Sequence, residues 1–349
     1  MTDEPARTKL IEFLIGMGAT EEDIEQYANE LPSLASVVLL RPGKERLTLA
    51  ECADRAGMTV EEVRRLWLLT GFADPAPDAR VTSEAEVSLF QMVKAAGALF
   101  GEDAVLQLSR VIGSSMARIA DAAVSMFLVN VELPLHVDEA DIELAVAKAN
   151  VDAVSFIPAL TEAMGLLLRR HIIAGRRGFF GVQVDGGSET QRLAIGFVDL
   201  VGSTSLAQTT TLAEMGAVLS RFEELSYDAV ASRGARLVKL IGDEVMLSTP
   251  NADVALAVAS EIVEALRSHR DVPPVRAGLA FGDVMTRDGD CFGPVVNVAA
   301  RAVKLAEPSQ VVMSAAFRAA LSDTSALQSM GPKSVKGIDE PLEFWTLQA

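Results

Sequence analysis

Near the middle of the chain, one carboxylate ends an apolar run, and small hydroxyl residues follow it. Residues 197–207 read FVDLVGSTSLA, in which Asp199 closes the run and Gly202 leads into a segment of helical composition. Serine and threonine accept hydrogen bonds from the N–H groups of a helix start, so the hydroxyls could form an ordinary helix cap. The same N–H groups could instead bind a phosphate, with Asp199 holding Mg²⁺ beside it. This stretch alone leaves both interpretations open.

A second carboxylate lies between two apolar runs in RLVKLIGDEVMLST, residues 236–249. Asp243 follows Gly242 there, so it is either an ordinary residue of a hairpin turn or a second ligand of the same metal. Lys239 stands inside the first apolar run. A lysine in such a run either extends its ammonium group to water or contacts a ligand.

Basic and amide side chains follow further along the chain. Arg276 opens the apolar stretch VRAGLAFGDV, where it is either an edge charge or a ligand contact. In DGDCFGPVVNVAARAVKLA, residues 288–306, Asn297 and Arg301 stand four residues apart. On a helix this spacing makes the two side chains neighbours, either on a solvated face or at a binding site.

These stretches lie in the half of the chain that differs in character from the rest. Residues 1–177 alternate helical stretches with short breaks and contain no convincing strand, and Pro158 predicts a kink in the last helix. Residues 178–191 are glycine-rich and predict a linker. Residues 192–349 alternate helices with five strand-like runs, which predicts an α+β domain. The runs are RLAIGFVDL, RLVKLIGDEVMLST, VRAGLAFGDVMT, QVVMSA and PLEFWTLQ.

The composition argues against several classes of protein. The chain has 349 residues, half of them hydrophobic, which is enough for two domains. A net charge of -17 opposes a nucleic-acid partner, because phosphate contacts need clustered Lys and Arg. The two cysteines are far apart and fit a reducing compartment. With no signal peptide and no uncharged apolar run of membrane-spanning length, we expect a cytoplasmic protein without a transmembrane segment.

In order, the four stretches resemble the class III nucleotidyl cyclases. The shared pattern is F-x-D-x-x-G-x-T, K-x-x-G-D, R-x-G and D-x-F-G-x-x-V-N-x-A-x-R, over about residues 192–349. Residues 6–180 resemble the helical N-terminal module of soluble mycobacterial adenylate cyclases of this class. The resemblance implies three parts: an all-α regulatory domain (1–177), a joint (178–191) and a ferredoxin-like catalytic domain with a βααββαβ core (192–349).

The resemblance implies an adenylate cyclase, which converts ATP to cyclic AMP and pyrophosphate with two divalent cations, Mg²⁺ or Mn²⁺. The cations would be bound by Asp199, Asp243 and the carbonyl of Leu200. Small residues would let the backbone approach the phosphates, and basic side chains would hold the triphosphate. The residues with these roles would be Gly202, Ser203, Thr204, Arg276 and, as an extra contact, Lys336.

In this family two chains pack head to tail, and each active site lies across their interface, which implies a homodimer. The partner would supply Lys239 and Asp290 to adenine, Asn297 to the ribose, and Arg301 to the charge that develops at the α-phosphate. The flanking FG and VNVAAR motifs place Asp290, not Cys291, at the base-reading position. This register favours ATP over GTP.

Other functions remain as alternatives. Guanylate cyclases replace the two base-reading residues, and diguanylate cyclases carry a GGDEF signature that GDE at 242–244 resembles in part. Ile241 and Val245 depart from that signature. From another class, residues 47–72 fit the helix-turn-helix pattern of a DNA-binding regulator. Basic and acidic residues balance over 44–65, which favours a structural helical hairpin.

The signal for the helical half is not evident in its sequence, and a proton or an apolar ligand is the candidate. The last predicted helix contains TEAMGLLLRRHIIAGRR and runs toward the first catalytic strand. His171 lies in it, beside Arg169 and Arg170, and histidine changes charge between pH 5 and 8. This placement predicts that the helical half sets the pH response through the joint.

Overall fold

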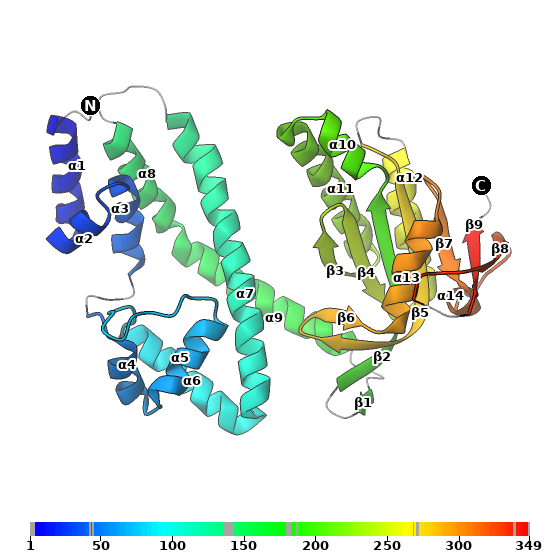
Figure 1. Cartoon of the computed structure of the whole chain (residues 1–349), viewed down its shortest axis with the longest axis horizontal. Coiled ribbons are helices and arrows are strands. Elements are labelled where there is room, and N and C mark those ends of the chain that lie inside the picture. The colour runs from blue at the N-terminus through cyan, green and yellow to red at the C-terminus, as the bar shows by residue number, and fades with distance from the viewer. Residues whose placement is uncertain are drawn as a thin grey trace. The chain divides into compact units, whose positions relative to one another are not determined.

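The computed structural model describes residues 4–41, 43, 45–135, 142–178, 183–185, 188–267, 269, 272–337 and 340–347. The chain forms two compact units, one ending at Ile172 and the other beginning at Ile173. Figure 1 shows the helices of the first unit in blue to green and the sheet of the second in green to red.

The first unit is helical in its described part, apart from one β-bridge between Leu47 and Thr82. At the predicted kink the helix is interrupted for one residue, because α8 ends at Ser155 and α9 starts at Ile157 with Pro158 in its first turn, where proline is tolerated. The elements are α1 (Glu4–Met17), α2 (Glu21–Gln26), α3 (Leu31–Leu40), α4 (Leu49–Ala56), α5 (Val60–Leu69), α6 (Glu84–Phe100), α7 (Glu102–Phe127), η1 (Leu128–Glu132), η2 (Leu133–Leu135), α8 (Ile142–Ser155) and α9 (Ile157–Gly178).

Two helical stretches of this unit expose much apolar surface. By length and composition alone, Glu102–Leu135 and Ile142–Gly175 could each cross a membrane. Within the chain, only 6% and 0% of their most apolar windows are buried. Core helices of soluble proteins pass the same test of length and composition. The finding is therefore weak evidence against the prediction that the chain lacks a transmembrane segment.

The second unit is one twisted sheet with helices on both faces. Its strand order is β3-β4-β2-β5-β7-β9-β8, with β1 paired to β2 and β6 paired to β5. Only the β5–β7 pairing is parallel among the described strands. The strands are β1 (Gln183–Asp185), β2 (Ser188–Leu200), β3 (Arg236–Ile241), β4 (Glu244–Thr249), β5 (Val275–Arg287), β6 (Asp290–Phe292), β7 (Val311–Ser314), β8 (Leu327–Lys333) and β9 (Leu342–Leu347).

The order of elements confirms the predicted βααββαβ core as β2, α10, α11, β3, β4, α12 and β5. All five predicted strand-like runs form strands, whereas β1, β6 and β8 were not predicted. β1 and the first four residues of β2 fall within the predicted linker 178–191. β6 is three residues long, and β8 is an edge strand that contains glycine and proline, so neither has a strong strand pattern. The helices are α10 (Ser203–Thr209), α11 (Leu212–Ser232), α12 (Ala252–Arg267), α13 (Pro294–Leu305) and α14 (Ala315–Ala319).

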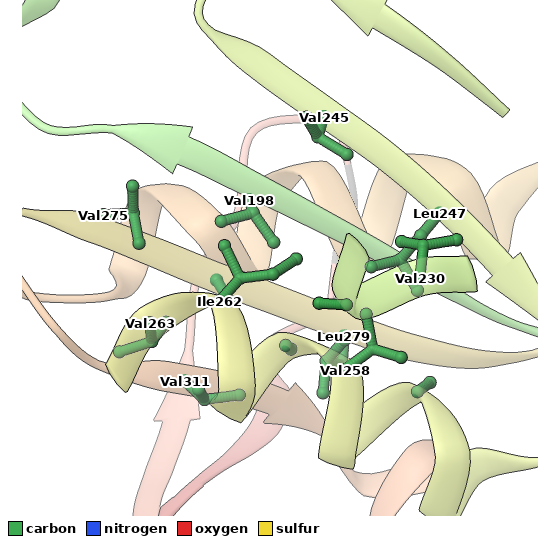
Figure 2. Close-up of a cluster of buried hydrophobic side chains, with 14 of the residues drawn as sticks. Val198, Val230, Val245, Leu247, Val258, Ile262, Val263, Val275, Leu279 and Val311 are labelled. Carbon is green, nitrogen blue, oxygen red and sulfur yellow. The ribbon is translucent and has the colours of Figure 1, made fainter. Parts of the chain in front are cut away.

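Alternate residues of the central strands enter two different cores, because successive side chains of a strand point to opposite faces. On β2, Val198 and Leu200 pack against α11 and α12, and Figure 2 shows Val198 in this cluster with Ile262 of α12. Ile195 and Phe197 pack instead with α13, on the other face. We call these the α12 face and the α13 face of the sheet.

Helix α13 lies unusually close to β5, and a glycine makes that approach possible. A Cβ atom on Gly278 would stand 2.2 Å from the backbone nitrogen of Val303 and 2.5 Å from the carbonyl oxygen of Ala299. Both atoms belong to the backbone of α13, so neither can move aside independently of the helix. The position of α13, which carries Asn297 and Arg301, therefore depends on the missing side chain of Gly278.

We expect Gly278→Ala to lower the free energy of unfolding by roughly 2–3 kcal/mol, at the upper end of the usual cost of overpacking. Urea denaturation followed by circular dichroism measures this change. Gly216→Ala is the control, because Gly216 lies in α11 with no atom within 4 Å of a new Cβ. That substitution should stabilise the protein by about 0.5–1 kcal/mol. Equal effects of the two substitutions would contradict the close packing.

Candidate active site

Three charged side chains meet at one end of the central strands. In the sheet register, Asp199 of β2 stands opposite Glu244 of β4 on one side and opposite Arg276 of β5 on the other. Residues directly opposite each other share a face. Since Val198 and Leu200 lie on the α12 face, these three charged groups lie on the α13 face.

Asp199 is paired with Arg276 within the chain. The Oδ2 atom of Asp199 accepts hydrogen bonds from Nη2 of Arg276 at 2.8 Å and from Nε at 3.0 Å. The two side chains are only 16% and 29% exposed. The arginine thus neutralises a carboxylate whose burial would otherwise be costly.

Asp243 lies next to Asp199 although the two are far apart in sequence. The backbone nitrogen of Leu200 donates to the carbonyl oxygen of Asp243 at 3.1 Å, which joins the end of β2 to the β3–β4 turn. The hydroxyl of Ser203 donates to Oδ2 of Asp243. The structure therefore brings together the two predicted metal ligands and the first hydroxyl of the loop.

The loop after β2 is not closed by a side-chain helix cap. Gly202 is the N-cap of α10, with a left-handed φ of 77° that favours glycine, and no side-chain cap hydrogen bond is formed there. Ser203 turns its hydroxyl to Asp243 instead. The side chain of Thr204 lies outside the described residues. The simple capping interpretation of this stretch is thus wrong for Ser203.

The oxygen ligands at this end of the sheet suit a magnesium or manganese ion. Among the described residues, no group of three or more His, Cys, Asp or Glu side chains forms a metal cage. Mg²⁺ is usually held by one or two carboxylates together with substrate phosphates and water, not by a cage of protein ligands. Asp199, Asp243 and the carbonyl of Leu200 fit that pattern. A cation bound at Oδ2 of Asp199 would compete with the guanidinium group of Arg276 for that atom.

A second polar pair lies at the edge formed by β3 and the β5–β6 hairpin. The Nζ atom of Lys239 is 2.5 Å from Oδ2 of Asp290, with 39% and 27% of the side chains exposed. The other oxygen, Oδ1, accepts a hydrogen bond from the backbone nitrogen of Cys291 at 2.8 Å. Cys291 itself is buried, and burial raises the pKa of its thiol. Asp290, not Cys291, is therefore the side chain next to Lys239.

The remaining predicted residues are separate from these two groups. Asn297 is exposed and Arg301 half-buried on α13, whose buried side is formed by Ala299, Ala302 and Val303. Within the described residues, neither Asn297 nor Arg301 has a side-chain hydrogen bond or ion pair. Lys336 is exposed, and no contact in the described structure connects it to the rest of the site.

The sequence analysis missed Glu244. Burial raises its pKa to about 7, and the negative charge of Asp199 adds to this effect. The sequence did contain a signal. Glu244 directly follows Asp243, and because side chains alternate along a strand, it lies on the same face as Met246 and opposite Val245. Its significance depends on the β2–β4 register, which the sequence does not display.

The helix-turn-helix pattern of the first unit forms two consecutive helices, but its charges do not suit DNA binding. Helix α4 ends at Ala56 and is capped by Gly57, whose φ is 66°, and α5 follows after a short turn. Arg55 bonds two glutamates, at 2.6 and 2.9 Å, and Arg64 bonds Asp74. Arginines that are already neutralised contribute little to phosphate binding. The geometry favours a structural hairpin.

Two family models match the chain in sequence order. The adenylate cyclase regulatory domain matches residues 2–173, and the adenylate and guanylate cyclase catalytic domain matches residues 187–349. Together they cover both units. The second match includes the charged end of the sheet, the Lys239–Asp290 pair and α13.

Relatives extend over both units as well. An uncharacterised protein of Mycobacterium tuberculosis is 36% identical, over 98% of this chain and 90% of that protein. An adenylate cyclase of Streptomyces coelicolor is 33% identical, over 80% of this chain and 72% of that enzyme. A pH-sensitive adenylate cyclase of Mycobacterium tuberculosis is 28% identical, over 97% and 86% of the two chains.

The raised pKa of Glu244 predicts that this residue makes the folded protein less stable as the pH rises. Between pH 4.5 and about 7 the unfolded state loses this proton while the folded state keeps it, so the free energy of unfolding falls as pH rises. Gln cannot ionise, so the stability advantage of Glu244→Gln over the parent should grow by about 1–2 kcal/mol from pH 4.5 to 8, discounted for partial exposure.

Urea denaturation in EDTA at pH 4.5 and 8 measures this difference. Glu264→Gln, at an exposed position of α12, is the control for a general effect of removing a carboxylate. An advantage of Glu244→Gln that stays constant between the two pH values would contradict the assignment.

Proposed function

The chain belongs to the class III adenylate cyclases, and from this premise we propose that it converts ATP to cyclic AMP and pyrophosphate at two sites shared by a homodimer. The observation that carries the proposal is the meeting of Asp199 and Asp243 at adjacent strand ends, beside Arg276. The two carboxylates can bind cations, and the arginine can bind a triphosphate. Three of the four family motifs contribute a residue to this end of the sheet.

Asp199, Asp243 and the carbonyl of Leu200 hold two divalent cations in this proposal. When bound, such ions lower the pKa of the ribose 3′-hydroxyl and neutralise the triphosphate. Arg276 changes partner on substrate binding, because the triphosphate offers its guanidinium group anionic oxygens in place of Asp199. The backbone around Gly202 and Ser203 approaches the phosphates closely, since these residues are small.

Lys239 and Asp290 select adenine. The edge of adenine presents a ring nitrogen that accepts a hydrogen bond and an amino group that donates one. A lysine donor beside a carboxylate acceptor complements this order. Guanine presents the reverse order, an oxygen acceptor and an N–H donor, so it would leave both groups mispaired. This contrast supports ATP as the substrate, against a guanylate cyclase.

Asn297 and Arg301 complete the site of the partner chain. Within the described residues both lack partners in their own chain, which leaves their donors for substrate. Arg301 stabilises the charge that develops at the α-phosphate, and Asn297 orients the ribose. Lys239 and Asp243 belong to one hairpin yet serve different sites of the dimer. A single chain therefore has no complete site.

The helical unit regulates the catalytic unit in this proposal. Helix α9 begins in the first unit and continues past Ile173 into the second, so it connects them covalently without a break in helical structure. His171 lies exposed in α9, while His136 lies outside the described residues. A change in α9 is the simplest way to reach the catalytic strands. The named pH sensitivity of one relative supports a proton as the signal.

Mixing two inactive variants tests the shared site. Asp199→Ala and Asn297→Ala each damage both sites of a homodimer, but their heterodimer has one site with both lesions and one with none. An equal mixture should recover about a quarter of the parent activity, because half of the randomly formed dimers are heterodimers with one intact site. Cyclic AMP formation from ATP with Mn²⁺ is the readout.

The control mixes Asp199→Ala with Asp243→Ala. Both lesions then fall in the half-site that one chain supplies, so each site of the heterodimer carries one lesion and no activity returns. If the first mixture stays inactive while the chains exchange, the composite site is wrong. If both mixtures recover activity, the assignment of residues to half-sites is wrong.

The pH–activity profile of the full chain tests the regulatory proposal. We expect His171→Ala to flatten or shift the profile between pH 5 and 8, because histidine is the side chain that most readily changes charge in that range and alanine cannot. His269→Ala, in the catalytic unit beside Arg221, is the matched control and should preserve the profile. Identical profiles of the parent and His171→Ala would contradict proton sensing at this residue. An apolar ligand would then be the better candidate signal.

A further inference from the structure

A second basic residue of β3 contacts the hairpin that carries Asp290. The guanidinium group of Arg236 donates from Nη2 to the carbonyl oxygen of Gly289. Gly289 lies in the two-residue turn between β5 and β6, where Arg287 pairs with Asp290. Asp288 and Gly289 have φ values of 56° and 80°, both left-handed, as a tight hairpin turn requires. Arg236 thus contacts the turn one residue before the predicted base-reading carboxylate.

A β-bulge explains how Arg236 and Lys239 reach the same hairpin. Residues three apart on a regular strand point to opposite faces. The register of β3 and β4 shifts between Leu237 and Lys239, so Val238 is an extra residue. One extra residue restores a common face to side chains that would otherwise diverge. Arg236 and Lys239 therefore contact consecutive residues of one hairpin, Gly289 in its turn and Asp290 at the start of β6.

Core packing confirms this change of parity independently. Leu237 and Leu240 both pack on the α12 face, although they also stand three residues apart. Val238 packs on the α13 face. The side chains of Arg236 and Lys239 are thus directed to the face opposite Leu237 and Leu240. Cys291 of the hairpin is buried on that α13 face.

The hairpin needs a support of this kind. Strand β6 is three residues long and, in the described sheet, pairs only with β5. From β3, its turn is held through Arg236 on the backbone and Lys239 on the carboxylate. When Lys239 turns to a base, the arginine remains as the polar connection from β3 to the turn. Its acceptor is a carbonyl, which adenine does not compete for directly.

We propose that Arg236 is a positioning residue for base selection, which holds the β5–β6 turn so that Asp290 stays in register with Lys239 when adenine binds. The inference rests on the proposed assignment of Lys239 and Asp290 to the base. It assigns Arg236 no contact with substrate. Arg236 acts by keeping the Asp290 carboxylate of β6 at the right distance from the Lys239 ammonium group of β3.

The test compares substitutions of Arg236 in the full chain. Arg236→Met keeps the aliphatic stem and removes the donors. It should raise the KM for ATP and lower the ATP-over-GTP ratio of kcat/KM by about threefold to tenfold, the effect expected for one net hydrogen bond. The kcat for ATP should change little. Arg236→Lys keeps a donor and should restore most of the discrimination, which a purely steric role would not predict.

Arg233→Ala is the matched control. Arg233 lies just before β3 and forms an exposed ion pair with Glu261, 2.7 Å away. This variant should leave both KM and the nucleotide ratio at the parent values. Thermal unfolding of every variant shows whether a change in ratio accompanies a loss of fold. A fall in ratio for Arg233→Ala as large as that for Arg236→Met would overturn the proposal.

A double-mutant cycle isolates the route through Asp290. If Arg236 acts by positioning that carboxylate, Arg236→Met should change the ATP-over-GTP ratio little in an Asp290→Ala background. Additive effects of the two substitutions would overturn the proposal. If Arg236→Met fails to fold, Arg236→Gln replaces it in the same cycle, because the glutamine side chain is too short to reach the turn.

Lys239→Ala separates failure of this inference from failure of the proposed function. If Lys239→Ala collapses discrimination while Arg236→Met leaves it intact, the base assignment stands and the positioning role of Arg236 is wrong. If Lys239→Ala leaves the ratio unchanged, the base assignment is wrong and the positioning role falls with it.

Discussion

The active end of the sheet depends on how one poorly exposed carboxylate is neutralised. Asp199 stands between Glu244 and Arg276 in the strand register, on the face that α13 covers. Asp199 is paired with Arg276, while burial, together with the nearby charge of Asp199, raises the pKa of Glu244.

The sheet has to be covered on both faces for this charge cluster to be stable. The α12 face contains most of the apolar core, and the α13 face combines a smaller core with the polar groups. Gly278 brings the backbone of α13 against β5, which sets the height of Asn297 and Arg301 above the sheet. The α13 face therefore carries both a packed core and the polar residues of the candidate site. A change in the contact between α13 and Gly278 would affect both of them.

A single hairpin contributes to both groups of the proposed site, the Asp199–Asp243 group and the Lys239–Asp290 pair. The β3–β4 hairpin carries Lys239 on its strand and Asp243 in its turn. The bulge at Val238 turns Lys239 toward the β5–β6 hairpin, while Asp243 stays with the end of β2. Within the described residues, no hydrogen bond or ion pair joins the two groups.

The sequence by itself determined the class of fold and most of the candidate residues. Alternating helices and apolar runs predicted the α+β unit, and the spacing of Asp199, Asp243, Lys239 and Asn297 identified the family, because local patterns and short motifs are written in consecutive residues. The tertiary structure decided which side chains meet, through the strand register, the bulge in β3 and the close approach of α13 to β5. Burial in the folded sheet raises the pKa of Glu244, and the charge of Asp199 on the paired strand adds to this effect. Arg236 reaches the turn before Asp290 through a bulge in β3. Both effects arise from pairing between distant segments, and a side-chain parity that shifts by one residue cannot be read from either segment alone.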